Sequence, residues 1–130
     1  MESGLSNSNT SGVSGTQNVW SELEVLLQDY APKSSVNVPH QEHVPTQVIL
    51  QNGGLFVGNV ISYHLMELQA CHDNILYLYD RKKIRNMCIG YAMAEDRKWR
   101  YHSWGLGHTY NIIETTAPFL LYFGCVLVPK

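Results

Sequence analysis

The spacing of apolar residues along the chain predicts two amphipathic helices. Apolar positions recur at intervals of three and four residues over 18–30, which is typical of a helix with one buried face: Trp20, Leu23, Leu26, Leu27 and Tyr30. A second set shares one face of a helix that we expect from about Ala70 to Lys83: Cys71, Ile75, Leu78 and Tyr79. Asp73 in the first turn of that segment and basic residues in its last turn suit the helix dipole.

The C-terminal third has the pattern of β-strands separated by short turns. Strands are expected over residues 87–95, 98–106, 110–116 and 120–128, joined as an antiparallel meander. Upstream, residues 47–50 and 55–61 are interpreted as a hairpin around Asn52-Gly53, a favoured hairpin turn. The fold class is therefore α+β, with N-terminal helices packed on an antiparallel β-sheet.

Composition limits the kind of protein this is. The 130 residues fit one domain, assigned to residues 18–130, after a tail over 1–17 that is rich in Ser, Asn, Gly and Thr and expected to be disordered. A net charge of −2 gives no electrostatic case for a nucleic-acid partner. No apolar run approaches the ~20 residues of a membrane span, so no membrane partner is expected. Three cysteines and no secretory signal favour a reducing, cytoplasmic setting.

Three residues that carry chemistry follow one another along these elements. Cys71 opens the second helix, His102 lies within a strand, and Glu114 lies on the strand after it. If residues 107–109 form the hairpin loop, His102 and Glu114 are directly opposed, with Cβ atoms about 5 Å apart. A cysteine in the first turn of a helix is favoured as thiolate. The order predicts a catalytic triad in which the thiolate attacks, the imidazole transfers the proton and the carboxylate orients the imidazole.

Other side chains are candidates to complete such a site. The Cys71 backbone N–H is a ready oxyanion donor, because the first amides of a helix are unpaired within it. A second donor could come from one of three amide side chains, of which Gln69 is slightly favoured: Gln69, Gln51 and Asn74. Three aromatic residues are candidates to line the substrate cleft: Trp104, Trp99 and Tyr91.

The words around the triad are Cys71-His72-Asp73-Asn74, Trp99-Arg100-Tyr101-His102-Ser103-Trp104 and Ile113-Glu114-Thr115-Thr116. These sequence motifs resemble those of the papain-like and transglutaminase-like cysteine-hydrolase superfamily, closest to small bacterial and phage members, over residues 65–125. The resemblance implies a papain-like fold in which Cys71, His102 and Glu114 are nucleophile, base and third member. The sequence departs from papain by lacking a Gln about six residues before the cysteine and by having Glu as third member.

These observations predict a cysteine hydrolase or acyl transferase acting on an amide, isopeptide or thioester bond, and leave protease, deamidase and transferase open. The substrate would be a peptide, a protein or a small amide, with no cofactor and no metal. The alternative is a catalytically inactive binding module on the same fold, in which Cys71 is a buried filler and Glu114 an outward-facing strand residue. A zinc-dependent domain built on residues such as His40, His43 and His64 is a third reading, although no spacing matches a closed site. The sequence does not indicate an oligomeric state.

Overall fold

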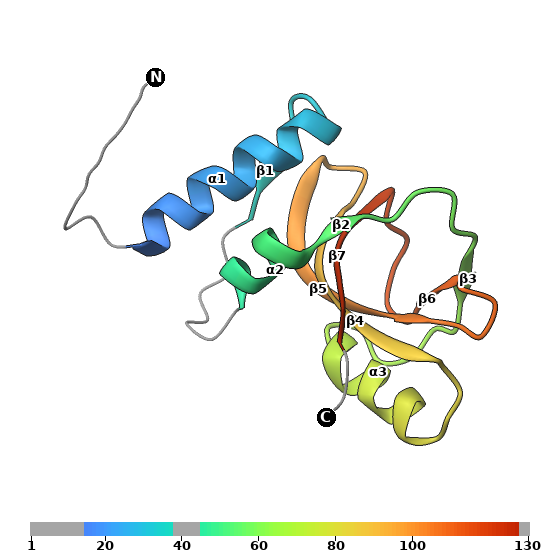
Figure 1. Ribbon diagram of the computed structural model, residues 1–130. Helices are drawn as coiled ribbons and strands as arrows, with labels where there is room; N and C mark the ends of the chain where they lie inside the picture. The colour runs from blue at the N-terminus through green and yellow to red at the C-terminus, as the bar shows by residue number, and fades with distance from the viewer. Residues whose placement is uncertain (1–14, 38–44, 128–130) are drawn as a thin grey trace.

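The helices of this protein pack on a single β-sheet (Figure 1). The computed structural model describes residues 15–37 and 45–127. The helices are α1 (Gly15–Tyr30), α2 (Thr46–Asn52) and α3 (Cys71–Asp80). The strands are β1 (Ser35–Val36), β2 (Gly54–Leu55), β3 (Ile61–Tyr63), β4 (Asn86–Met93), β5 (Lys98–Leu106), β6 (Ile112–Glu114) and β7 (Leu121–Leu127).

The sheet runs in the order β2-β7-β4-β5-β6-β3, and β1 pairs with β5. The long strands β4, β5 and β7 are antiparallel, whereas β1 and β3 pair in parallel with β5 and β6. The predicted meander is therefore wrong at its last step, because β7 pairs with β4 and not with β6. Gly124 lies opposite Gly90 in that pairing, and a Cβ on either residue would come within about 2.2 Å of a backbone oxygen of the neighbouring strand. Two facing glycines thus permit the close approach of β7 to β4.

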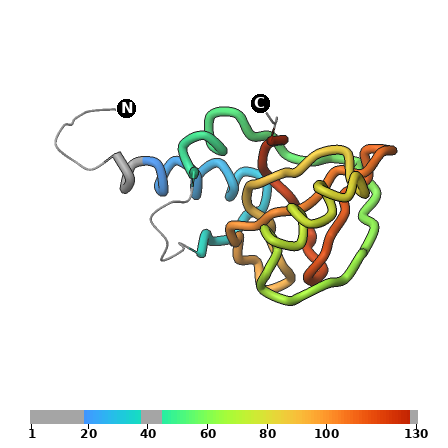
Figure 2. The backbone as a smooth tube through the Cα atoms, turned by 90° about the horizontal axis from the view of Figure 1, so that it is seen from below, coloured from blue at the N-terminus to red at the C-terminus, as the bar shows by residue number. Residues whose placement is uncertain are grey.

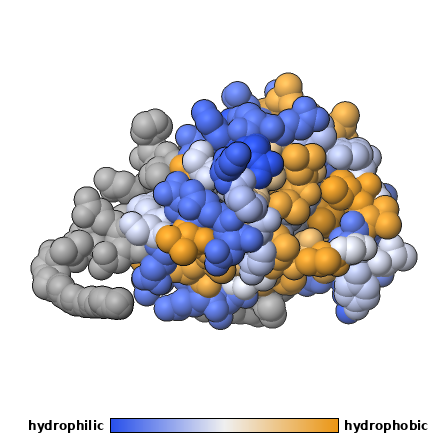
Figure 3. Space-filling view, turned by 90° about the horizontal axis from the view of Figure 1, so that it is seen from above, coloured by the Kyte–Doolittle hydropathy of each residue, from blue (hydrophilic) through white to orange (hydrophobic). Residues whose placement is uncertain are grey.

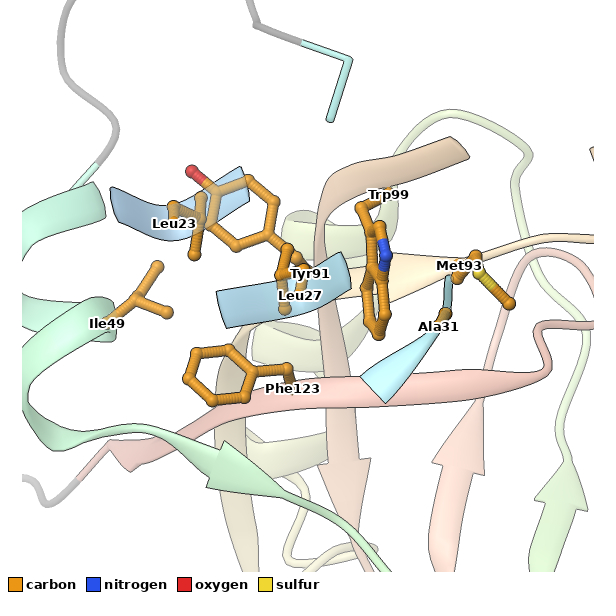
Figure 4. Packing of buried hydrophobic residues seen from close by; sticks show 8 residues of the cluster. All are labelled: Leu23, Leu27, Ala31, Ile49, Tyr91, Met93, Trp99 and Phe123. Atoms are coloured by element: carbon orange, nitrogen blue, oxygen red, sulfur yellow. The ribbon is translucent and has the colours of Figure 1, made fainter. Parts of the chain in front are cut away.

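One face of the sheet packs against α1 and α2. Leu23, Leu27 and Ile49 of these helices meet the aromatic rings of Tyr91, Trp99 and Phe123 (Figure 4). The polar atoms in this layer are paired: the Trp99 indole N–H donates to Ser34 Oγ at 3.0 Å, and the Tyr91 hydroxyl lies 2.8 Å from Thr46 Oγ1. Residues at odd positions of β5 point toward this helical layer.

Helix α3 packs farther along the same face. Ile75 and Leu78 pack with Ile84, and Met87 of β4 and Ile113 of β6 lie against them.

The opposite face of the sheet has a smaller aromatic core. Trp104, Tyr122 and Ile112 are buried there, and Phe56, Ile61 and Phe119 from the connecting segments cover them. Figure 2 shows the segment between β2 and α3 running around the outside of the sheet. His102 and Glu114 point into this second core, because strand side chains alternate between faces.

The structure confirms the two expected helices, and α1 begins at Gly15, three residues inside the segment assigned to the tail. Residues 1–14 and 38–44, which include His40 and His43, lie outside the described residues. The hairpin at Asn52-Gly53 is wrong, because Thr46–Asn52 is helix α2. Gly53 caps that helix with its N–H on the Ile49 carbonyl at 2.7 Å, and a Cβ on Gly53 would lie 2.4 Å from the same oxygen. The glycine is required by the end of a helix and not by a hairpin turn.

Several apolar side chains are exposed, among them Val57, Val60 and Leu120. Figure 3 shows hydrophobic side chains gathered over part of one face, away from the grey residues. Of the helices in the described residues, none combines the length and apolar character that a membrane crossing requires.

Candidate active site

Cys71, His102 and Glu114 meet where the start of α3 approaches the edge of β5. His102 Nε2 lies 2.9 Å and 3.1 Å from the two carboxylate oxygens of Glu114. The Cys71 thiol lies close enough to the imidazole for each group to shift the pKa of the other. Because Nε2 faces the carboxylate, the other ring nitrogen, Nδ1, serves the thiol. The imidazole therefore bridges sulfur and carboxylate.

The contact between His102 and Glu114 forms in a different register from the one expected. Gly105 pairs with Ile113 and Leu106 with Ile112, so the direct opposition of His102 and Glu114 is wrong by two residues. Extending the observed register would put Trp104 opposite Glu114. A shift of two keeps both side chains on the same face, since strand side chains alternate with period two. The long carboxylate side chain then reaches His102 diagonally.

Glu114 is fully buried, and its carboxylate accepts hydrogen bonds from three residues. The Tyr122 hydroxyl donates to Oε1 at 2.7 Å, and the backbone N–H and hydroxyl of Thr116 both donate to Oε2 at 3.0 Å. Burial alone would raise the pKa of this carboxyl, but the hydrogen bond and charge of His102, with Tyr122 and Thr116, lower that pKa below its usual value. Glu114 is therefore a buried anion with a full set of donors.

The thiol and the imidazole shift each other's ionisation. Burial alone would raise the pKa of Cys71, but the hydrogen bond and charge of His102 outweigh it, helped by the backbone N–H groups of Ser103 and His72, and that pKa is lowered. Burial alone would lower the pKa of His102, yet its hydrogen bonds and charge interactions with Cys71 and Glu114 raise it to about 9. Both shifts favour a thiolate–imidazolium pair over the neutral thiol and imidazole.

Two side chains hold the start of α3 in place. His72 Nδ1 is hydrogen-bonded to the Ser103 hydroxyl, which ties the helix to β5 beside the thiol. Asn74, one turn into α3, donates to the Glu67 carbonyl at 2.8 Å and to Thr115 Oγ1 at 3.2 Å. Thr115 follows Glu114 directly, so Asn74 fixes the distance between the nucleophile and the carboxylate strand.

The three amide candidates for the oxyanion site fall in different places. Gln69 lines the cleft beside Cys71, in a left-handed backbone conformation with φ of 64°. Asn74 is buried, and because its amide nitrogen donates to two protein acceptors, it has no N–H left for a substrate. Gln51 is exposed on α2, which packs with α1, and it does not line the cleft. Only Gln69 and the Cys71 backbone N–H remain as candidate donors.

A cleft of about 600 Å³ opens over the thiol, and its lining differs from the expected one. Trp99, Trp104 and Tyr91 are each fully buried and lie in the two cores, so their assignment to a substrate cleft is wrong. Trp104 instead stacks behind the His102 ring at 6.1 Å between centroids. The aromatic residues that line the cleft are Tyr101 and Phe119, and the Phe119 ring lies 4.4 Å from His102.

The sequence carried a signal for these two positions. Tyr101 adjoins His102 in the strand, and Phe119 follows Pro118 in the loop between β6 and β7. Only the three-dimensional path of the backbone shows that this loop returns to the histidine.

The other metal and thiol candidates stay apart. Within residues 15–37 and 45–127, no group of three or more His, Cys, Asp and Glu side chains could hold a metal ion. Burial raises the pKa of Cys88 to about 12, and burial likewise raises that of Cys125. Of the three cysteines, Cys71 alone has its thiol pKa shifted downward.

Comparisons of the sequence and structure with protein-family models, with curated protein sequences and with solved structures each give no match. The resemblance to papain-like hydrolases stays a prediction, and function has to be argued from the geometry of the site.

Proposed function

We propose that the protein is a cysteine-nucleophile hydrolase or acyl transferase on a papain-like fold, acting through Cys71, His102 and Glu114. The observation that carries this proposal is the arrangement of a thiol beside an imidazole that is hydrogen-bonded to a buried carboxylate, with the thiol and the imidazole lining an open cleft. A cysteine kept only as a core filler has no need for a buried imidazole whose other nitrogen contacts a buried carboxylate. The placement of the thiol at a helix start beside an antiparallel sheet, with His then Glu on that sheet, supports the papain-like assignment.

The chemistry follows from the protonation states. The Cys71 thiolate attacks the carbonyl carbon of an amide, isopeptide or thioester, forming a C–S bond while the carbonyl electrons move to oxygen. The Cys71 backbone N–H and the Gln69 amide are placed to stabilise that oxyanion. As the oxyanion collapses, the bond to the leaving group breaks and the leaving group takes the proton from His102 Nδ1.

A water molecule or an amine then attacks the thioester. His102, now neutral, accepts the proton of the attacking group, and the C–S bond breaks to restore the thiolate and the imidazolium. Glu114 stays ionised throughout and holds the imidazole in orientation. Hydrolysis and transfer differ only in the attacking group.

The test is selective alkylation of the folded protein. With iodoacetamide near pH 6.5, followed by peptide mass spectrometry, we expect Cys71 to react at least about tenfold faster than Cys88 or Cys125, because the thiolate is the reactive form. A Cys71→Ser variant identifies the fast site. If all three cysteines react slowly and at similar rates, the enzyme proposal fails and the inactive binding module becomes the better reading.

A further inference from the structure

Part of β5 has no neighbouring strand on one of its edges. On its other edge, β4 pairs with it continuously from Trp99 to Leu106. On the edge in question, β1 pairs only with Lys98 and Trp99, and β6 pairs only with Gly105 and Leu106. Residues 100–104 therefore form a gap in the sheet, among the residues that the structure describes.

The backbone groups that point into this gap belong to alternate residues. Asn37 N–H donates to the Trp99 carbonyl, and Gly107 N–H donates to the Asn111 carbonyl, so odd-numbered residues direct their N–H and C=O toward this edge. Within the gap these are Tyr101 and Ser103. The Ser103 N–H lies close enough to the Cys71 sulfur to lower the pKa of that thiol. For Tyr101, neither ladder reaches its N–H or C=O, and no other described residue hydrogen-bonds to them.

The gap and the active-site cleft are the same place. Arg100, Tyr101 and His102 line the cleft along β5. Asn37, just after β1, lines one end, and Thr116 and Ala117, just after β6, line the other. A strand advances about 3.3 Å per residue, and Ser103 is two residues from Tyr101. Cys71, which lies beside the Ser103 N–H, is therefore about 7 Å along the edge from Tyr101.

We propose that the substrate of this site is an extended peptide, whose backbone adds to β5 as a short strand between β1 and β6. Its backbone C=O and N–H pair with the N–H and C=O of Tyr101, and a carbonyl farther along the peptide then lies at Cys71. This inference rests on the proposed function and narrows it, since a small amide has no second peptide group to pair with Tyr101. Backbone pairing supplies binding that does not depend on side-chain identity.

The test uses electrophiles that label the thiol. The probes are a mixture of acetyl-tripeptide vinyl sulfones with randomised side chains, the same mixture N-methylated at one amide at a time, and methyl vinyl sulfone. Rates are read from intact mass and divided by each probe's rate with free cysteine, and Cys71→Ser confirms the labelled residue. We expect the peptide probes to react at least about tenfold faster than methyl vinyl sulfone. N-methylation of one particular amide should lower the labelling rate at least about tenfold, because it deletes a hydrogen-bond donor and blocks strand pairing.

Gln51→Ala is the control variant, since Gln51 is exposed on α2 and does not line the cleft; it should keep the preference for peptide probes. Rapid alkylation of Cys71 by iodoacetamide with no advantage for the peptide probes, or no effect of N-methylation, would overturn the peptide inference alone. Slow reaction of Cys71 with every reagent would overturn the proposed function and this inference with it.

Discussion

Replacing Glu114 by glutamine removes one charge from the site and exchanges one acceptor oxygen for an NH2 group. Glutamine has the same shape and keeps one oxygen to accept a hydrogen bond. In the native site the carboxylate oxygens lie 2.9 Å and 3.1 Å from His102 Nε2 and also accept bonds from Tyr122 and Thr116. The variant therefore tests whether the charge of Glu114 sets the ionisation of the pair formed by Cys71 and His102.

The magnitude follows from the separation of the charges. Two unit charges about 4 Å apart interact by about 4 kcal/mol at the effective dielectric constant typical of proteins, which corresponds to about three pKa units. The pKa of His102, raised to about 9 in the native protein, would fall below neutrality in Glu114→Gln. The imidazole would then be neutral at pH 7, and the thiolate of Cys71 would lose its cation.

The assay is the pH dependence of Cys71 alkylation by iodoacetamide. At about pH 6.5 we expect the Glu114→Gln variant to react at least about tenfold more slowly than the native protein, with the rates converging at high pH where every accessible thiol is ionised. Tyr122→Phe is the matched control: it removes one donor to the same carboxylate but keeps the charge, so it should change the rate by less than about threefold. A Glu114→Gln protein that folds and keeps the native pH profile would refute the ion-pair reasoning.

Two further substitutions test the frame around the site. Asn74→Ala deletes one buried and one part-buried hydrogen bond and should lower the free energy of unfolding by about 1–3 kcal/mol in urea denaturation. Gln51→Ala, on the exposed surface of α2, should change the free energy of unfolding by less than about 0.5 kcal/mol, and equal effects would contradict the positioning role of Asn74. Gly124→Ala would put a Cβ 2.2 Å from the Ile89 carbonyl oxygen and should lower the melting temperature sharply, while Gly54→Ala, where a Cβ meets nothing within 4 Å, should not. A native melting temperature for Gly124→Ala would show that β7 and β4 can separate without cost.

The elements that could be predicted from sequence are those whose local pattern and tertiary role agree. The strand over 98–106 has the predicted bounds, and α3 begins at Cys71, one residue from its expected start. The predicted hairpin differs from the observed helix over 46–52 because Asn-Gly favours a hairpin locally, while burial of Ile49 against the sheet stabilises a helix. Side-chain pattern alone cannot separate these when the run is only a few residues long.

The site shows the same division. The three members of the triad could be chosen from the sequence because each needs a specific chemical group on a specific kind of element. The aromatic residues of the cleft could not be chosen in this way, since tryptophan and tyrosine suit a core as well as a cleft. Trp99 and Tyr91 are buried with their polar atoms hydrogen-bonded to Ser34 and Thr46. The gap in β5 was also out of reach of sequence reasoning, because it depends on where the short strands β1 and β6 stop pairing.

The opposite pKa shifts of Cys71 and His102 make a prediction about stability. In the unfolded protein at pH 7–9 the thiol keeps its proton, with an ordinary pKa of 9.0, and the imidazole has lost its proton, with an ordinary pKa of 6.5. We predict that the lowered pKa of Cys71 removes the thiol proton of the folded protein over this range, while His102 keeps its proton up to about pH 9. The pair of Cys71 and His102 then holds one proton in both the folded and the unfolded state, so it should contribute no pH dependence to the free energy of unfolding over this range.

A Cys71→Ala variant breaks that balance. His102 loses the contributions of Cys71 that raise its pKa but retains the charge and hydrogen bond of Glu114. We expect its folded pKa to fall below about 9 but to stay above its ordinary value, so that its stabilising contribution is complete only below about pH 6.5. That contribution is lost as the pH rises through the folded pKa, because the folded state then binds more protons than the unfolded state. Urea denaturation at several values between about pH 6.5 and 9 should show stability falling relative to the native protein. A Cys125→Ala control should run parallel to the native curve, since burial holds the proton on that thiol. If the Cys71→Ala and native curves run parallel too, the thiol and imidazole are not ionised as a pair, and Cys71 rests as a neutral thiol beside a neutral ring.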